Sequence, residues 1–188
     1  MCLKIPALLA ASGLAAFVIQ PTHATTVLQM TLDDLASRAD LVFRGSVTSA
    51  EPGPVEVGGG TLPTVTYGVF VEEQFKGDYP SSNGKTVVTI TMIGTLKPGG
   101  GIVNGQRRMD ALPALPELTV GETYVLFTTR PSAMGLSTTV GLGQGSFKIH
   151  LSHEGEELAA NELNNAGLFN GPVPYATLAR AVRAALGD

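Results

Sequence analysis

Cysteine is nearly absent from this chain of 188 residues. Its one cysteine, Cys2, stands before the first apolar run, whereas a lipoprotein anchor needs a cysteine at the end of such a run. Beyond Cys2 the chain can form no disulfide, and it offers no thiol nucleophile and no thiolate metal ligand. A fold without these links depends on side-chain packing alone, which a chain of this length can supply.

Three other features are also missing, and each excludes a class of protein. No Asn-X-Ser/Thr acceptor for N-glycosylation occurs, which together with the scarcity of cysteine suits a bacterial periplasmic or secreted protein. The N-terminal apolar run, Ile5–Ile19, is shorter than the roughly 20 residues of a membrane-spanning helix. The 12 Lys and Arg residues are outnumbered by 16 Asp and Glu residues, which argues against nucleic acid or anionic lipid as the main partner.

The N-terminal segment does have the pattern of a cleaved export signal. A short basic start, Met1–Lys4, precedes the uncharged run Ile5–Ile19, and the small residue Ala24 follows at a position that a signal peptidase prefers. We therefore predict that Met1–Ala24 is a cleaved signal peptide. The rest, Thr25–Asp188, is expected to be a single exported domain, periplasmic or extracellular, with no membrane span.

Alternating apolar residues predict that this domain is mainly β. The expected strands are Asp40–Ala50, Thr64–Phe75, Lys85–Ile93, Glu122–Thr129 and Gly143–Ser152, with Leu136–Leu142 as a further partner strand and a brief strand at Ile102-Val103. Clusters of glycine and proline predict loops at Glu51–Pro63 and Gly94–Glu117. Gly45 falls inside the first strand, which indicates a bulge or a bend.

A helix is expected at each end of the strand-rich region. Thr31 can cap a short helix over Leu32–Ala39, in which both leucines and both alanines share one face. The tail after Pro172 has an apolar stripe at helical spacing and stops at Gly187. Together these elements predict a small five- or six-stranded antiparallel barrel, OB-like, with a short N-terminal helix and a C-terminal helix.

Four motifs follow one another in a distinctive order. Ala39–Val47 reads a-D-L-V-x-x-G-x-V, the next long strand ends in Phe75-Lys76-Gly77, and the chain continues to Val120–Phe127 and the glycine-rich Gly143–Phe147. Over about Asp40–Leu151 this order resembles the netrin-like module, the OB-fold barrel also found in tissue inhibitors of metalloproteases. The order is similar as well to that of small exported bacterial proteins of unknown function.

The resemblance implies a barrel that serves as an interaction module. The metalloprotease inhibitors bind the zinc of their target through an N-terminal cysteine, and they contain several disulfides. This chain has no cysteine after Cys2, so the chelating residue is not carried over and we assign no inhibitory residue. A fold alone does not fix a function.

Histidine and carboxylates come together at one place in the sequence. His150, His153 and Glu154 are followed by two further glutamates, and these residue types are ligands for zinc and other divalent ions. This is the candidate centre of a metal-dependent or hydrolytic enzyme. On a strand, however, His150 and His153 point to opposite faces, and they meet only if Ser152 begins a turn. The alternative is a solvated hairpin tip, and we predict no metal.

The remaining motifs dictate no reaction, and no cofactor is predicted. The serine nucleophile elbow Gly-X-Ser-X-Gly does not occur. Gly141–Gly145 has neither the spacing nor the following helix of a dinucleotide-binding loop. The carboxylate pairs Asp33-Asp34 and Glu72-Glu73 are sequence neighbours, which is typical of solvated faces. We therefore expect a protein that is not an enzyme.

The long segment Gly94–Glu117 is the candidate binding surface, since long irregular loops are often functional. Its cations and the apolar residues beside them are Lys97, Ile102, Val103, Arg107 and Arg108. We predict that it faces a partner, another exported protein of which a protease is one example. The alternatives are a mobile insertion here and, for the whole protein, a structural envelope component without a specific ligand. The sequence sets no oligomeric state.

Overall fold

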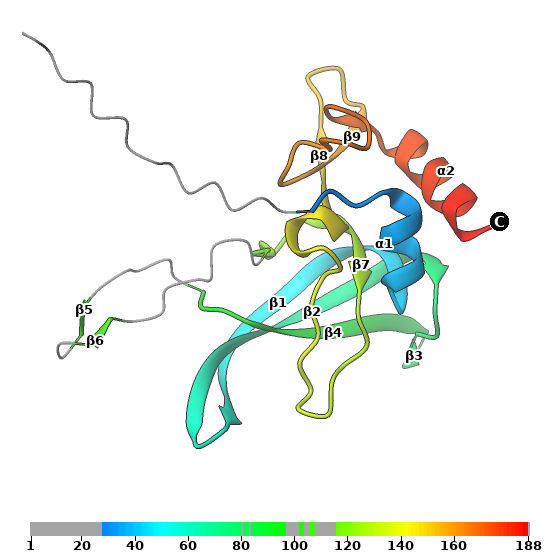
Figure 1. Ribbon diagram of the computed structural model, residues 1–188. Coiled ribbons are helices and arrows are strands. Elements are labelled where there is room, and N and C mark those ends of the chain that lie inside the picture. Colours follow the sequence, from blue (N-terminus) through cyan, green and yellow to red (C-terminus); the bar gives the residue numbers. More distant parts are fainter. Residues whose placement is uncertain are drawn as a thin grey trace, which may run out of the picture.

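The computed structural model describes residues 28–79, 81–82, 84–96, 102–103, 106–107 and 116–187. In these residues the protein is mainly β, with one twisted antiparallel sheet and two helices packed on one side of it (Figure 1). The predicted signal peptide lies outside them. None of the helices described has the length and hydropathy that crossing a membrane requires.

The elements follow in chain order. They are α1 Leu32–Arg38, β1 Leu41–Val57, β2 Gly60–Lys76, β3 Ser81–Ser82, β4 Lys85–Ile93, β5 Ile102–Val103, β6 Gln106–Arg107, β7 Thr123–Thr128, a 3₁₀ turn Leu142–Gly145, β8 Ser146–Leu151, β9 Glu157–Asn161, β10 Val173–Pro174 and α2 Tyr175–Leu186.

Seven strands form the main sheet in the order β10-β9-β8-β7-β1-β2-β4, and the two-residue β3 pairs with β4 at its edge. The predicted closed barrel of five or six strands is therefore wrong. Within the described ranges the edge strands do not pair with each other, although Ser137 in the loop after β7 donates its N–H to the Thr91 carbonyl of β4 at 2.9 Å. The sheet stays open because β8 occupies the edge of β7 that β4 would have to reach.

Two apolar cores lie on opposite faces of the sheet. The helix-covered core comprises Met30, Leu35, Ala36, Ala39, Val42, Val125, Phe127, Val140, Phe147, Ile149, Ala159, Leu178 and Val182. The strand-enclosed core, inside the curl of β1, β2, β4 and β7, comprises Phe43, Val47, Val65, Tyr67, Val69, Val71, Val88, Ile90, Met92, Leu118, Tyr124 and Leu126. The alternating apolar residues of β2 and β4 all belong to the second core, so the strands predicted at Thr64–Phe75 and Lys85–Ile93 each turn one face inward.

A β-bulge lies opposite Gly45, where the sequence indicates a bulge or a bend, and its extra residue belongs to β2 rather than to β1. The pairing of β1 with β2 shifts between Arg44 and Gly45. A Cβ atom at Gly45 would lie only 2.6 Å from the carbonyl oxygen of Phe70, so β2 can approach this closely only because the residue is glycine. Glu72 is the extra residue of the bulge, and this position brings its side chain to Arg44.

The predicted loop Glu51–Pro63 is wrong, since these residues continue β1 and β2 as a two-stranded ribbon. We call this ribbon the arm. Its pairing runs from Glu51 with Thr66 to Val57 with Gly60, whereas β7 pairs only with the first residues of β1 and β4 reaches only Thr64 on β2. The arm therefore extends beyond both neighbouring strands (Figure 1).

Glycine and proline have specific places in the arm. Gly58 and Gly59 form its turn with φ values of +57° and +82°, the conformation that a two-residue hairpin needs. The prolines at positions 52, 54 and 63 lie where the ribbon pairs with no outer strand. The N–H group that each proline lacks therefore costs no hydrogen bond to a neighbouring strand.

The N-terminal helix α1 is confirmed and is fixed at both ends. The Thr31 side chain accepts the Asp34 N–H, and the Asp34 carboxylate accepts the Thr31 N–H, which is a capping box. At the other end Lys76 of β2 donates to the carbonyls of Ala36 and Ala39, at 2.7 Å each. A basic group at this end also complements the helix dipole.

The C-terminal helix α2 is confirmed as well. Leu178 and Val182 bury the predicted stripe in the helix-covered core, and Gly187 ends the helix with φ +84°. The segment before it departs from prediction. Leu136–Leu142 provides only an isolated bridge between Thr139 and Thr128, and β9 was not predicted.

Candidate functional site

The predicted binding segment is described only in part. Ile102 and Val103 of β5 pair with Arg107 and Gln106 of β6 in a separate two-stranded hairpin, so the brief strand predicted there is confirmed. Lys97 and Arg108 lie outside the described residues. The role of this segment as a partner-facing surface stays a prediction.

The predicted histidine and glutamate cluster lies in the turn between β8 and β9. The Ser152 hydroxyl accepts the N–H groups of Glu154 and Glu156 at 3.3 and 3.1 Å, so a turn does begin at this serine. His150, His153 and Glu154 are all exposed. In the part of the chain that the structure describes, no three His, Cys, Asp or Glu side chains are grouped to hold a metal ion.

A charged network that the sequence analysis did not identify lies at the margin of the helix-covered core. Arg44 on β1 makes a bidentate pair with Glu157 of β9, with both N···O distances 2.7 Å, and its Nε donates to Glu72 of β2 at 2.8 Å. The Arg44 guanidinium also lies over the Tyr175 ring, 4.4 Å from its centroid. One side chain, only 17% exposed, thus joins three strands to α2.

A second cation extends this network along α2. Arg183 pairs with Glu73 of β2, and the Tyr175 hydroxyl donates to the same carboxylate. Arg183 also lies over the Phe75 ring, 5.3 Å from its centroid. Two positions about two turns apart on α2 are therefore tied to β2.

The ionisation of these groups follows from their pairing. The hydrogen bonds from Arg44 hold the pKa of Glu157 below its ordinary range, and the same bonds raise the pKa of Arg44. Burial raises the pKa of the Tyr175 phenol. These shifts favour charged Arg44 and Glu157 and an uncharged Tyr175, the states in which the observed contacts form. We interpret the charged network as a structural tie rather than a catalytic centre.

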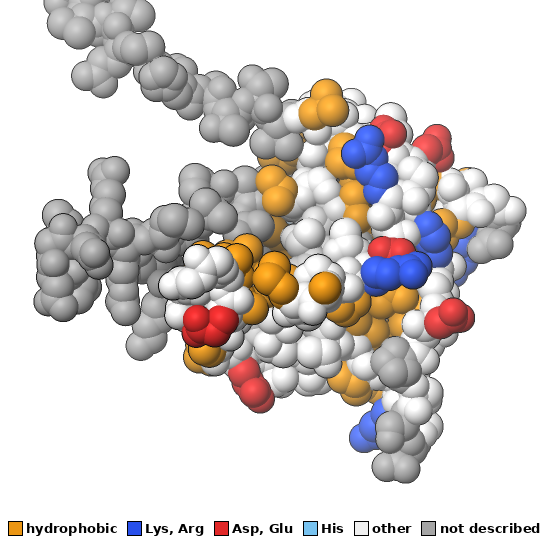
Figure 2. All heavy atoms as spheres, turned by 60° about the horizontal axis from the view of Figure 1, so that its bottom comes forward, with side chains coloured by type: hydrophobic (Ala, Val, Ile, Leu, Met, Phe, Trp, Pro, Cys, Tyr) orange, Lys and Arg blue, Asp and Glu red, His pale blue; other side chains and the backbone are white. Residues whose placement is uncertain are grey.

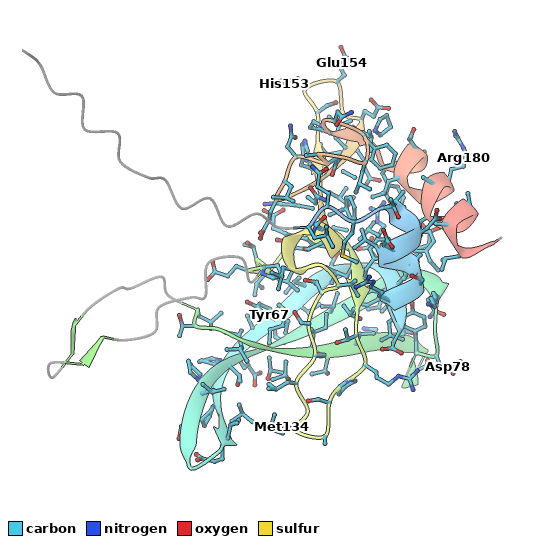
Figure 3. All side chains as sticks on the ribbon, viewed as in Figure 1. Tyr67, Asp78, Met134, His153, Glu154 and Arg180 are labelled. Atoms are coloured by element: carbon cyan, nitrogen blue, oxygen red, sulfur yellow. The ribbon has the colours of Figure 1, made fainter. Side chains whose placement is uncertain are left out.

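One exposed and several partly exposed apolar residues lie at the opposite end of the molecule. The arm and the loop 129–138 extend in the same direction, away from α2 and from the turn between β8 and β9 (Figure 1). Met134, near the tip of this loop, is 51% exposed, and Figure 3 shows it at the far end of the molecule from His153 and Glu154. We call the arm and this loop together the arm surface.

The loop in the arm surface is held in one conformation by hydrogen bonds. Thr129 donates its N–H to the Thr138 carbonyl at 2.9 Å, and Ser132 donates to the Leu136 carbonyl at 2.7 Å. The contact of Ser137 with β4 adds a third fixed point. The loop therefore presents Met134 on a defined turn.

Charge is scarce on the arm surface. Residues 47–69 contain only two charged side chains, Glu51 and Glu56, and the loop 129–138 contains only Arg130, which pairs with Asp40 at 2.8 Å. Val55, Val57 and Leu62 share one face of the arm and are partly exposed. Figure 2 turns this end toward the reader and shows hydrophobic side chains on the surface, with separate acidic and basic groups among them.

Comparison of the chain with protein-family models, with curated proteins and with solved structures found no match. The resemblance to the netrin-like module accordingly stays a hypothesis. The geometry of the described residues is therefore the basis from which a function is inferred.

Proposed function

We propose that this protein is an exported, non-enzymatic module that binds another exported protein through the arm surface. The proposal depends mainly on one observation: beyond β4 and β7 the strands of the arm pair only with each other. A two-stranded ribbon gains little stability by itself. A long apolar ribbon that stands clear of its sheet is therefore better explained by a contact with a partner than by a need of the fold.

The side chains of the arm surface fit a protein partner. Val55, Val57 and Leu62 provide an apolar strip, and Met134 adds a flexible side chain of the kind common at binding surfaces. Exposed apolar patches on a soluble domain mark interaction sites. Since Glu51 and Glu56 are the only charges on the arm, the complementary surface is apolar with a basic margin.

Site-specific crosslinking in the exporting cell tests this proposal. A photoreactive amino acid is placed at Val55 or at Met134, and a matched control places it at Leu151, which is 69% exposed at the opposite end. We expect one shared adduct from the two arm-surface positions and no such adduct from Leu151. Mass spectrometry then identifies the partner, and its binding is measured with purified components.

Two variants that introduce a negative charge complete the test. Val55→Glu and Leu62→Glu should each weaken binding of the purified partner about tenfold or more, because an acidic group would be buried against an apolar surface. Leu151→Glu should leave it unchanged. Equal adducts from all three crosslinking positions, or no adduct from the arm surface, would contradict the proposal.

A further inference from the structure

A hollow separate from the arm surface lies between the residues that lead into α1 and the 3₁₀ turn after β7. Its volume is about 280 Å³. The residues that line it are Leu28, Gln29, Met30, Asp34, Arg38, Gly141, Leu142 and Gln144. Small-molecule sites begin at about 300 Å³, so the hollow suits only a small ligand.

The wall of the hollow is fixed by a buried amide. The Gln144 side chain is 3% exposed; its oxygen accepts the Met30 N–H at 2.9 Å and its NH₂ group donates to the Leu28 carbonyl at 3.0 Å. Asn161 in turn donates to the Gln144 carbonyl at 3.1 Å. The hollow is therefore preformed, and a ligand would not have to order these segments.

The 3₁₀ turn contributes a strained residue to the same wall. Leu142 has φ +60°, in the left-handed region that a leucine rarely adopts. The Thr139 hydroxyl donates to the Leu142 carbonyl at 2.6 Å and so helps to hold this conformation. Such strain is concentrated where side chains are presented to ligands.

The hollow has one cation available for a ligand. Arg38 is exposed, and no hydrogen bond or close ion pair joins it to any residue that the structure describes, although its charge helps to lower the pKa of Asp34 in the same wall. Asp34, one turn earlier, already accepts the Thr31 N–H and hydroxyl at 3.0 and 2.7 Å. Beside Arg38 the wall is apolar, and Leu28 is 79% exposed.

We propose that this hollow binds a small amphipathic monoanion, such as a short-chain carboxylate. The anionic group pairs with the Arg38 guanidinium, and the apolar part lies against Leu28 and Leu142. A planar guanidinium recognises a carboxylate through paired hydrogen bonds. This site is independent of the arm surface, so the two proposals can fail separately.

Titration calorimetry with hexanoate tests this site on the chain that begins at Thr25. We expect saturable binding that tightens about fourfold for each CH₂ group added from butanoate to hexanoate. Hexan-1-ol, which lacks the charge, should bind about tenfold more weakly. Arg38→Gln should weaken hexanoate binding about tenfold and leave hexanol binding unchanged.

Two further variants separate a site from general attraction. Arg180→Gln removes an exposed cation on α2 (Figure 3) that does not line the hollow, and should not change binding. Leu28→Ser removes exposed apolar contact and should weaken hexanoate and hexanol alike. The proposal is overturned if hexanoate does not saturate, if Arg180→Gln has the effect of Arg38→Gln, or if binding appears only when residues 25–27 are removed.

Discussion

The helix-proximal end of the β1–β2 pair and the arm belong to the same two strands, yet they differ in burial, charge and strand pairing. At one end of β1, Val42 is fully buried and Arg44 ties four elements together. At the other end the arm pairs with itself, apart from one hydrogen bond from the Gly94 N–H to the Pro63 carbonyl at its base, and it carries no basic residue.

Under the proposed function, one continuous pair of strands would serve two purposes. One end packs within the fold, and the other end contacts a partner. The bulge at Gly45 bends the strands around the cores, and the residues next to it supply the charged network. Beyond the reach of β4 and β7, side chains no longer contribute to a core. Both buried cores therefore lie within the part of the sheet that β4 and β7 reach, and the arm lies beyond them.

The largest effect is expected from a cavity in the helix-covered core. Phe147→Ala removes a fully buried ring and should lower the free energy of unfolding by about 3–5 kcal/mol. Phe70→Ala is the matched control, because Phe70 lies on the outer face of β2 and is 37% exposed. It should cost less than about 1 kcal/mol. Urea denaturation of both variants measures the contrast, and equal losses would contradict it.

Breaking the charged network should have the next largest effect. Arg44→Leu leaves the carboxylates of Glu72 and Glu157 without their shared partner. We expect a loss of about 2 kcal/mol, less than for a fully buried pair because Glu157 is 39% exposed. Arg180→Leu, an exposed cation on α2, should change the free energy of unfolding by less than about 0.5 kcal/mol.

The pH dependence of the free energy of unfolding tests the same network, through the carboxylate of Glu157. Because the folded state lowers the pKa of Glu157, the pair stabilises the protein above the ordinary carboxyl pKa of about 4.3. That contribution is lost as the pH falls through the lowered folded pKa. Between neutral and acidic pH, the free energy of unfolding of Glu157→Gln should therefore fall less than that of the unmodified protein. Urea denaturation at each pH measures both.

An exposed glutamate provides the control for this titration. Glu154→Gln, at the tip of the β8–β9 turn, should keep the pH dependence of the unmodified protein. If Glu154→Gln and Glu157→Gln flatten the curve equally, the pairing with Arg44 is not its cause.

The smallest effect on stability is expected from shortening the arm. Replacing residues 54–63 by Asn-Gly keeps the pairing of Gly53 with Thr64 and closes a new two-residue hairpin. The free energy of unfolding should change by less than about 1 kcal/mol, while the crosslinked adduct at Met134 should be lost. A loss above about 2 kcal/mol would show that the arm supports the fold.

Local patterns predicted the regular elements but not their arrangement. The alternation in Lys85–Ile93 and the cap at Thr31 are local signals, and both are confirmed. Glu157–Asn161 has no clear alternation, and its place in the sheet depends on pairing with β8 and β10. Closure of a barrel is equally non-local, because it depends on which strand occupies the outer edge of β7.

The functional surfaces were harder to predict for related reasons. Arg44 meets its partners 28 and 113 positions away, so no spacing rule reveals the charged network. The arm did have a local signal, since Gly58-Gly59 lies between Val55, Val57 and Leu62, which is typical of a hairpin. The density of glycine and proline outweighed that signal and favoured a loop.

The bond between Met30 and Gln144 spans 114 positions, and that between Arg44 and Glu157 spans 113. Synthesis delivers the N-terminal half first, so α1 and β1 must wait for the last quarter of the polypeptide before their core can close. For a protein exported as we propose, this delay would keep the nascent chain unfolded until it is exported. The helix-covered core would then form only after export.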